Sequence, residues 1–490
     1  MIPHKKLKID NYQLETNQLL LANYFKIMYL CCDTCVSLNR IIKQDYIYMQ
    51  WTKLLSTKRF GMEDYYDMRN HDRTEYQRDY DRLIFSSPFR RLQNKTQVFP
   101  LPGSVFVHNR LTHSLEVASV GRSIGNYVGK SLRSKYPDSE AHFEEIGDIV
   151  AAACLAHDLG NPPFGHSGEK AIGTFFSEGK GQNLQHEVES EGGRWADFTH
   201  FEGNANAIRL LTHQFIGRRQ GGFAMTYSTL ASIVKYPYSS ELSGKKQKFG
   251  FFASEEESYL KIANDLGIRQ LNSESLHFAR YPLVYLVEAA DDICYQIMDI
   301  EDAHKLNLLT TEKTIHLFLQ FFEADRLASV TRNLNLVDDV NEKIAYLRSS
   351  IIGLLVSECA NVFMHNEEEI IKGSFQRTLI NNIPPTPLEA YKQCTQFAIA
   401  NIYKSKEVLD IELAGYHIIG SLLERFIDAI QTPTHAYSTI LLNRVPQQYN
   451  MYADNITERI QAVIDFVSGM TDVYALDLYR KITGMDVPLL

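Results

Sequence analysis

An adjacent histidine and aspartate form the strongest local candidate for chemistry. His157 and Asp158 end an apolar run and precede Gly160 and the Pro162-Pro163 pair. Because proline has a fixed φ and no amide donor, these prolines predict that the helix ends here. An imidazole nitrogen beside a carboxylate oxygen at a helix end can bind one divalent cation. A lone His-Asp pair is nevertheless more often structural, so the interpretation depends on further ligands.

Two other regions supply candidates for such ligands. His113 lies 44 residues before His157, in the first turn of a predicted amphipathic helix. Glu288, Asp291 and Asp292 interrupt an otherwise apolar predicted helix. A carboxylate buried in such a helix costs several kcal/mol unless it is paired or binds a metal. Two histidines and two aspartates from three helices would give mixed nitrogen and oxygen ligation, which suits Mn, Mg, Fe or Zn used as a Lewis acid or a hydroxide generator.

Two further pairs stand at helical spacing. If a helix starts at Gly165, His166 and Glu169 share one face. The carboxylate could then fix the imidazole tautomer while the ring transfers a proton, although Glu169 could equally favour the helix dipole alone. Asp291 and Tyr295 are four residues apart, which would place Tyr295 beside the metal. The alternative for Tyr295 is a core tyrosine.

The elements that must position these residues are mostly helical. Apolar residues recur at helical intervals, and β-branched alternation is scarce, so we expect an all-α fold with small β-hairpin decorations. The clearest predicted helices cover residues 115–128, 146–155, 282–300, 344–362 and 411–430. Short extended segments are predicted at 96–99 and 104–107, around a Pro-Gly turn, and at 248–253, with loops at 178–193 and 236–248.

Composition places the chain among ordinary globular proteins. It has 490 residues, 44% hydrophobic and 22% charged, and a net charge of −9, so a polyanion must be bound by a local basic cluster. Seven scattered cysteines do not form a disulfide framework, and we expect a cytoplasmic location. Cys31, Cys32 and Cys35 lack a second ligand pair at zinc-finger spacing. The apolar segment 19–32, interrupted by Lys26, is too short to span a membrane.

Six longer segments resemble one known family. His113, His157-Asp158 and Asp291 match the metal signature of the HD-domain phosphohydrolases. The segments resemble the deoxyguanosinetriphosphate triphosphohydrolases, in that family's order. They are RRLQNKTQVFPL (90–101), NRLTHSLEV (109–117), HDLGNPPFGHSGE (157–169), FEGNANAIRL (201–210), EAADDICY (288–295) and SGMTDVYALDLYRK (468–481).

The resemblance implies a division of the chain. It extends from about Met49, which opens a natural protein start, to the C-terminus, and residues 306–401 match only in helical character. We therefore predict an N-terminal extension over 1–48, which could be an over-early start, and an HD-type catalytic core over 49–330. A helical C-terminal region over 331–490 would contribute to the core and to oligomer contacts.

The resemblance also implies a reaction, in which water attacks the α-phosphorus of dGTP and releases deoxyguanosine and tripolyphosphate. By the same resemblance His166 and Glu169 are the catalytic dyad, Tyr295 packs against the deoxyribose and Gln97 bonds the 3′-hydroxyl. A triphosphate brings about four negative charges, which need local cations and donors. The candidates for contacts with the substrate are Arg90, Arg91, Lys95, Arg110, Asn204, Lys235, Tyr236 and Lys248.

The predicted cofactor is one divalent metal per site, with Mn or Mg favoured over Fe or Zn. The predicted partners are dGTP, a second copy of the chain (a homohexamer by resemblance), and a single-stranded nucleic acid or nucleotide as effector; no membrane partner is expected. Two alternatives stay open. One is a broader dNTP triphosphohydrolase or another HD nucleotide phosphohydrolase, which only the pocket residues would distinguish. The other is a regulatory or single-stranded nucleic-acid-binding module with a vestigial HD site.

Overall fold

The computed structural model describes residues 48–64, 72–99, 107–272 and 274–486. The chain divides into two compact units, 1–49 and 50–490, and everything below concerns the second unit. The predicted extension over 1–48, with Cys31, Cys32 and Cys35, lies outside the described residues except for its last position. The predicted boundary near residue 330 stays a prediction.

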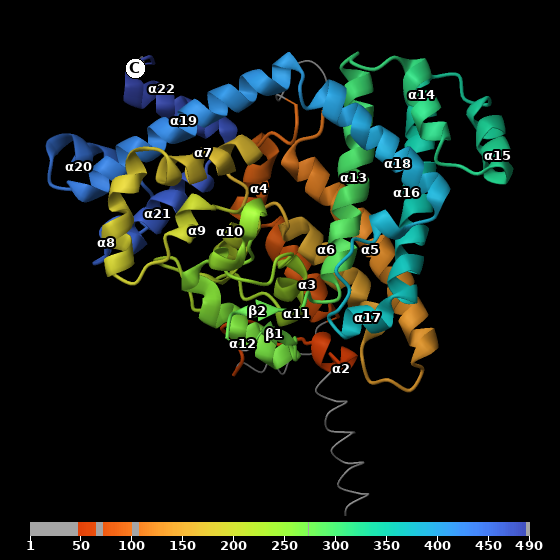
Figure 1. Cartoon of the computed structure of the whole chain (residues 1–490), viewed down its shortest axis with the longest axis horizontal. Coiled ribbons are helices and arrows are strands. Elements are labelled where there is room, and N and C mark those ends of the chain that lie inside the picture. The colour runs from red at the N-terminus through yellow and green to blue at the C-terminus, as the bar shows by residue number, and fades with distance from the viewer. Residues whose placement is uncertain (1–47, 65–71, 100–106, 273, 487–490) are drawn as a thin grey trace, which may run out of the picture. The chain divides into compact units, whose positions relative to one another are not determined.

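The all-α prediction is confirmed, because the described residues are mainly helical with one small sheet (Figure 1). The sheet pairs β1 (Gln270–Asn272) antiparallel to β2 (His277–Phe278). The shorter α-helices include α2 (Trp51–Leu54), α3 (Glu75–Ile84), α4 (Ser87–Arg91), α8 (Gln185–Ser190), α9 (Ala196–Thr199), α10 (Gly203–Thr212), α11 (Tyr227–Ile233), α12 (Glu256–Leu266), α14 (Thr311–Leu319), α15 (Ala324–Leu334), α17 (Glu367–Ile371), α18 (Pro385–Phe397) and α20 (Ala436–Leu442).

Three long helices form the scaffold beneath the candidate ligands: α5 (Arg110–Lys135), α6 (Ile146–Ala156) and α13 (Val284–Lys305). Helices α5 and α6 approach closely because glycines face each other, and a Cβ at Gly125 would lie 2.8 Å from the Cα of Gly147. Helix α13 packs against both, so side chains from all three helices can meet at one point.

Local sequence signals place the candidate residues at helix ends. The side chain of Asn109 accepts from the Thr112 amide, and the side chain of Thr112 accepts from the Asn109 amide. This capping box starts α5 just before His113. Helix α6 ends at Ala156, directly before His157-Asp158. Gly165 has a φ of 58°, and α7 (His166–Ser177) starts at the next residue.

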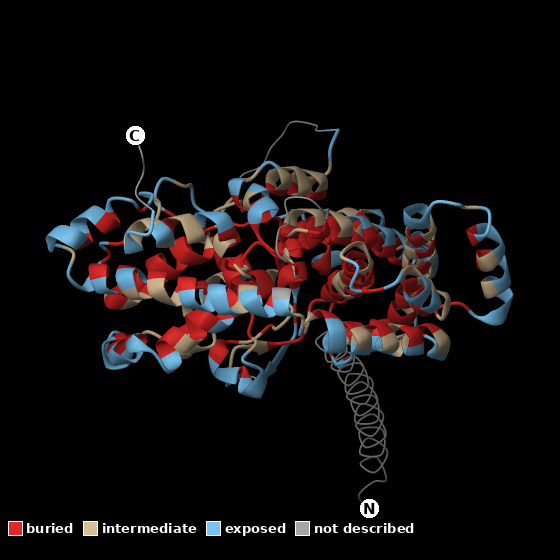
Figure 2. Cartoon of the chain, turned by 90° about the horizontal axis from the view of Figure 1, so that it is seen from above, coloured by how far each residue is buried: buried red, intermediate tan, exposed pale blue. Residues whose placement is uncertain are grey.

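The C-terminal helices pack beside α7. Helices α19 (Lys406–Gln431), α21 (Ile456–Ser468) and α22 (Asp472–Thr483) lie near α7 and α8 in Figure 1. Their apolar residues share one core with Phe175 and Phe176 of α7, and the buried residues line the inward faces of the helices (Figure 2). The C-terminal region is therefore positioned to support α7.

Two predicted local structures are wrong. Residues 248–253 form no strand, because Phe249, Phe251 and Phe252 are buried in the core, where packing accounts for their apolar character. Residues 178–193, predicted as a loop, contain a 3₁₀ turn (Lys180–Leu184) and α8, which bury Leu184 and Val188 against the C-terminal helices. The turn of the predicted hairpin around Pro102-Gly103 lies outside the residues that the structure describes. Before it, Thr96 pairs with Asn109 in an antiparallel bridge.

In the part of the chain that is described, one helix has the length and apolar character of a membrane span. It is α16 (Val340–His365), and about 39% of its most apolar window is buried. It packs against α5, α13 and α14. A core helix passes the same test of length and composition.

Candidate active site

Four predicted ligands converge where α5, α6 and α13 meet. The Nε2 atom of His113 lies 3.1 Å from Oδ1 of Asp291, and Nε2 of His157 lies 3.6 Å from the same oxygen. The His157 Nε2 atom is also 3.7 Å from Oδ1 of Asp158. One ligand atom each from His113, His157 and Asp158 fall within 4.8 Å of one another. These four side chains form what we call the metal cluster.

The tautomer of His157 leaves one nitrogen available for a cation. Its Nδ1 lies 2.6 Å from the carbonyl oxygen of Cys154, which can only accept, so Nδ1 carries the proton. Its Nε2 is buried and has no hydrogen-bond partner among the described residues. A hydrogen bond from the other ring nitrogen to a carbonyl orients imidazole ligands in metal sites, so the donor set fits a bound divalent metal.

The electrostatics of the metal cluster favour positive charge. Burial alone would raise the pKa of Asp291, but His157 and His113 hold it well below its usual value. Burial alone would lower the pKa of His157, yet Asp158 and Asp291 raise it to about 9. Both shifts have one cause, which is the attraction between positively charged imidazole rings and the carboxylates enclosed with them. A divalent ion would satisfy the same demand.

Polar neighbours orient Asp158. A guanidinium nitrogen of Arg110 donates to Oδ2 of Asp158 at 2.7 Å, and the side-chain amide of Asn161 donates to Oδ1. Burial alone would raise the pKa of Asp158, but the charge of Arg110, followed by those of His157 and His113, lowers it. Asp158 is thus held as a carboxylate within the metal cluster.

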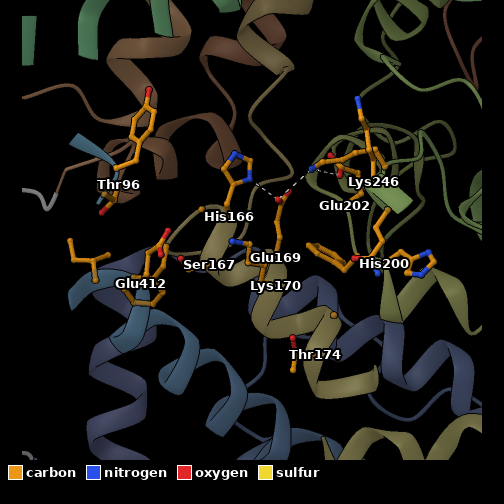
Figure 3. Close-up of a pocket in the computed structure, with 18 of the residues that line it drawn as sticks. Thr96, His166, Ser167, Glu169, Lys170, Thr174, His200, Glu202, Lys246 and Glu412 are labelled. Atoms are coloured by element: carbon orange, nitrogen blue, oxygen red, sulfur yellow. Dashed lines mark hydrogen bonds and ion pairs between the residues drawn. The ribbon is translucent and has the colours of Figure 1, made fainter. Parts of the chain in front are cut away.

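The predicted acid-base dyad is formed within one turn of α7. The His166 Nδ1 atom lies 2.8 Å from Oε2 of Glu169, and the amide of Gly203 donates to Oε1 at 2.8 Å. Figure 3 shows the His166 ring facing the Glu169 carboxylate. Lys248 Nζ lies 3.7 Å from Oε2. Burial opposes these contacts, but they lower the pKa of Glu169 to about 2. The hydrogen bond that His166 donates to Glu169 raises the pKa of His166, whose side chain is 71% exposed.

Two cavities share the dyad. The inner cavity, about 240 Å³, contains three members of the metal cluster, and the outer cavity, about 620 Å³, extends along α7. Six residues line both cavities: Gln97, His166, Glu169, Glu202, Lys248 and Tyr295. The inner cavity is also lined by Arg110, Asn204, Lys235 and Tyr236.

Comparison with known proteins agrees with this geometry. The HD domain model matches residues 110–236, and the phosphohydrolase-associated domain model matches residues 382–481. A deoxyguanosinetriphosphate triphosphohydrolase-like protein of Synechocystis is 34% identical over 452 residues, covering 90% of this chain and all of the relative. A protein of that name in Pseudomonas aeruginosa is 37% identical with the same coverage. The chain belongs to the deoxyguanosinetriphosphate triphosphohydrolase family of HD-domain phosphohydrolases.

Membership of this family makes the chain an HD-type hydrolase, and HD domains bind divalent metals. A relative in Yersinia enterocolitica, named deoxyguanosinetriphosphate triphosphohydrolase, is 30% identical and aligns with 84% of this chain and 94% of its own length. The HD match includes His113, His157-Asp158 and the dyad but ends before Asp291. The place of Asp291 in the metal cluster therefore rests on the distances above.

Most of the predicted substrate contacts of this HD phosphohydrolase lie around the cavities. The Oε1 atom of Gln97 is buried without a hydrogen-bond partner in the described chain. Lys235 pairs with Glu288 at 3.0 Å, and Lys248 pairs with Glu202 at 2.5 Å. These ion pairs hold two cations at the cavity walls.

Three predicted cations lie elsewhere. Arg90 is exposed and lines neither cavity. Lys95 is buried, and its Nζ donates to the carbonyl oxygens of Asn161 and Ser468. Burial lowers the pKa of Lys95 to about 7. Arg91 lines a separate small pocket near Lys95. The sequence pattern did not distinguish cations that face solvent or the interior from those that face the site.

One aromatic residue of the site was missed by the sequence analysis. Tyr403 lines the outer cavity, and its ring stacks on that of Tyr295 with centroids 6.0 Å apart. Its hydroxyl donates to Asp299 of α13 at 2.6 Å. It directly follows a π-helical turn (Ala398–Ile402), a rare element that often marks functional sites. No local motif in the sequence indicated that position.

Proposed function

We propose that the protein hydrolyses dGTP to deoxyguanosine and inorganic tripolyphosphate. The observation that carries this proposal is the buried, unpartnered Nε2 of His157 inside a four-residue metal cluster that shares a cavity with the dyad. The names of the relatives support the choice of dGTP.

His113, His157, Asp158 and Asp291 would hold one divalent metal, with Mn or Mg the leading candidates. Such a metal supplies a Lewis acid at a phosphoryl oxygen and lowers the pKa of water. Arg110 and Asn161 would keep Asp158 in orientation, since they bind its two oxygens separately. The Cys154 carbonyl would do the same for His157.

His166 suits the role of general acid. Its Nδ1 is occupied by Glu169, so Nε2 is the nitrogen free to exchange a proton with a substrate. Because Glu169 raises the pKa of His166, the ring stays cationic closer to neutral pH than a free histidine would. In the proposed reaction, the oxygen of a water molecule bonds to the α-phosphorus and the water releases one proton to solvent. The bond from phosphorus to the 5′-oxygen breaks, and His166 donates its proton to that oxygen.

The walls of the cavities suit a deoxynucleoside triphosphate. Lys235, Tyr236, Lys248, Arg110 and Asn204 would contact the phosphates from the inner cavity. Gln97 and Tyr295 line both cavities and would contact the sugar. Helix periodicity puts Tyr295 one turn after Asp291, so the ring lies beside the reacting end of the substrate.

The test is a substrate survey. Purified protein is incubated with each dNTP and each NTP in Mn²⁺ or Mg²⁺, and the released polyphosphate is identified. We expect tripolyphosphate from dGTP at the highest rate. Equal rates with all dNTPs would favour the broader dNTP triphosphohydrolase, and nucleic-acid binding without turnover would favour the regulatory module. The homohexamer, the effector and the cytoplasmic location stay predictions.

A further inference from the structure

The C-terminal segment SGMTDVYALDLYRK contains a carboxylate that the proposed chemistry does not use. Asp472 is the first residue of α22, and its side chain is buried. An aspartate there would ordinarily be explained by capping or by the helix dipole. The cap, however, is already made by Thr471, whose side chain accepts from the Tyr474 amide. The carboxylate of Asp472 is used elsewhere.

Asp472 joins two segments that are distant in sequence. Its Oδ2 accepts from the Thr96 amide at 2.8 Å and from the Thr96 hydroxyl at 2.6 Å. Its Oδ1 accepts from the Phe164 amide at 2.9 Å. Only a carboxylate can accept on both oxygens, because an amide would present donors to Thr96 or to Phe164. The charge and the geometry are therefore both required at this position.

Each joined segment leads into the site. Thr96 precedes Gln97, which lines both cavities. Thr96 also forms an antiparallel bridge with Asn109 at the start of α5. Phe164 is two residues before His166 and has a φ of 61°, a strained value for a residue with a side chain. A hydrogen bond to the Phe164 amide holds this strained residue just where α7 begins.

A second C-terminal helix supports the same residue. Gly415 of α19 faces Phe164, and a Cβ there would lie 2.6 Å from both Cβ and Cγ of Phe164. The ring therefore packs where α19 has no side chain. Lys95 adds a further link, since its Nζ bonds the carbonyls of Ser468 and Asn161. The loop between the metal cluster and the dyad is thus held at several points by the C-terminal region.

We propose that Asp472 is a positioning residue that sets Gln97 and His166 relative to each other, so that the C-terminal region determines where the sugar lies against the general acid. The inference rests on the roles of Gln97 and His166 in the proposed function. Asp472 itself touches neither substrate nor metal ligand in this arrangement.

The main test compares Asp472→Asn with Asp477→Asn. Asp477 lies on the same helix but forms a surface pair with Lys481 at 2.8 Å. We expect Asp472→Asn to lower kcat for dGTP about 10- to 100-fold, as displacements of about 1 Å do, and to narrow the preference for dGTP over GTP. Metal content should not change. Asp477→Asn should stay within about twofold of wild type, since exposed pairs contribute little.

Substitutions of Thr96 provide a second test that leaves the buried charge of Asp472 in place. Thr96→Ser keeps both donors and should retain the wild-type rate, whereas Thr96→Val loses the hydroxyl and should lower kcat. In an Asp472→Asn background, Thr96→Val should lower kcat little further, because both changes remove the same hydrogen bond. Fully additive effects would contradict the proposal. If Asp472→Asn fails to fold, as judged by thermal unfolding, the Thr96 pair decides the question.

A readout without substrate separates this inference from the proposed function. The pKa of His166 is measured by NMR in the full chain, with the resonance assigned by its loss in His166→Ala. We expect the pKa to fall toward its usual value in Asp472→Asn and to be unchanged in Asp477→Asn. If no nucleotide is hydrolysed, the proposed function fails while this titration still judges Asp472. An unchanged His166 pKa together with unchanged kinetics would overturn the positioning role.

Discussion

The metal cluster and the acid-base dyad line the same inner cavity but are built in opposite ways. The metal cluster is assembled from α5, the end of α6 and α13, whose residues are far apart in the chain. The dyad lies within one turn of α7. His113 is 2% exposed in the first, whereas His166 is 71% exposed in the second. The metal cluster and the dyad therefore differ in how far apart their residues lie in the sequence and in how deeply they are buried.

Their hydrogen bonding differs as well. In the dyad, both oxygens of Glu169 have partners, and one nitrogen of His166 is occupied. In the metal cluster, Nε2 of His157 has its nearest carboxylate oxygens at 3.6 and 3.7 Å. The dyad is hydrogen-bonded by protein atoms alone, whereas the metal cluster keeps a buried nitrogen that a cation could bind. Mutations in the two halves should therefore affect metal content and reaction rate separately.

The largest effect is expected from Asp291→Ala. Without this carboxylate, both histidines lose a neighbour and the remaining set no longer matches a divalent cation, so turnover should be abolished. His157→Ala should behave likewise. Metal content by elemental analysis should fall with activity. Asp292→Ala is the matched control, because the adjacent Asp292 lines neither cavity and should leave the metal bound. An Asp291→Ala protein with full metal and full rate would remove Asp291 from the metal cluster.

His166→Ala should slow the chemical step about 10²- to 10⁴-fold and leave metal content unchanged. Binding of a non-hydrolysable dGTP analogue should survive, because the metal cluster and the cationic walls are intact. His186→Ala is the control, because His186 is exposed on α8 and lines neither cavity. A kcat equal to that of wild type would mean that the pair with Glu169 only starts the helix.

Glu169→Gln should shift the pH dependence and lower kcat about 10- to 100-fold, the usual effect of losing a charged hydrogen bond. Glu169 raises the pKa of His166, so the cationic ring persists to higher pH. A general acid loses activity as pH rises through its pKa. Removing the carboxylate lowers that pKa, so the alkaline decline should begin at lower pH. Glu187→Gln, on exposed α8, should leave the profile in place. An unmoved decline would assign it to another group.

Tyr295→Ala should have the smallest effect, on sugar preference. A ribose 2′-hydroxyl against this ring would lose its water partners, which corresponds to about 10- to 100-fold discrimination. Without the ring, kcat/KM for GTP should approach that for dGTP while metal stays bound. Tyr437→Ala, an exposed tyrosine of α20, is the control. An unchanged ratio would direct attention to Gln97.

The sequence predicted those parts of the site that depend on local patterns. The helix predicted to begin at His113, the prolines after Asp158 and the spacing of His166 and Glu169 are each local patterns, and the structure has a helix start before His113, a helix end before Asp158 and a contact between His166 and Glu169. The helices themselves followed from apolar periodicity, which is a local property of amphipathic helices.

What the sequence did not predict depends on tertiary packing. Arg90 and Lys95 share one segment and one charge, yet Arg90 is exposed while Lys95 is buried against two carbonyls. Tyr403 enters the site because α18 and the π-helical turn that follows it pack against α13. The aromatic residues over 248–253 fit a strand or a core equally well by pattern, and only packing decided.

The most direct test of the central claim is hydrolysis of dGTP in ¹⁸O water with Mn²⁺ or Mg²⁺ bound. If the dyad protonates the 5′-oxygen while water attacks the α-phosphorus, the label must appear in tripolyphosphate, and the deoxyguanosine must be unlabelled. Mass spectrometry of both products gives the answer. Release of dGMP and pyrophosphate would contradict the account, because the bond broken would then lie on the other side of the α-phosphorus.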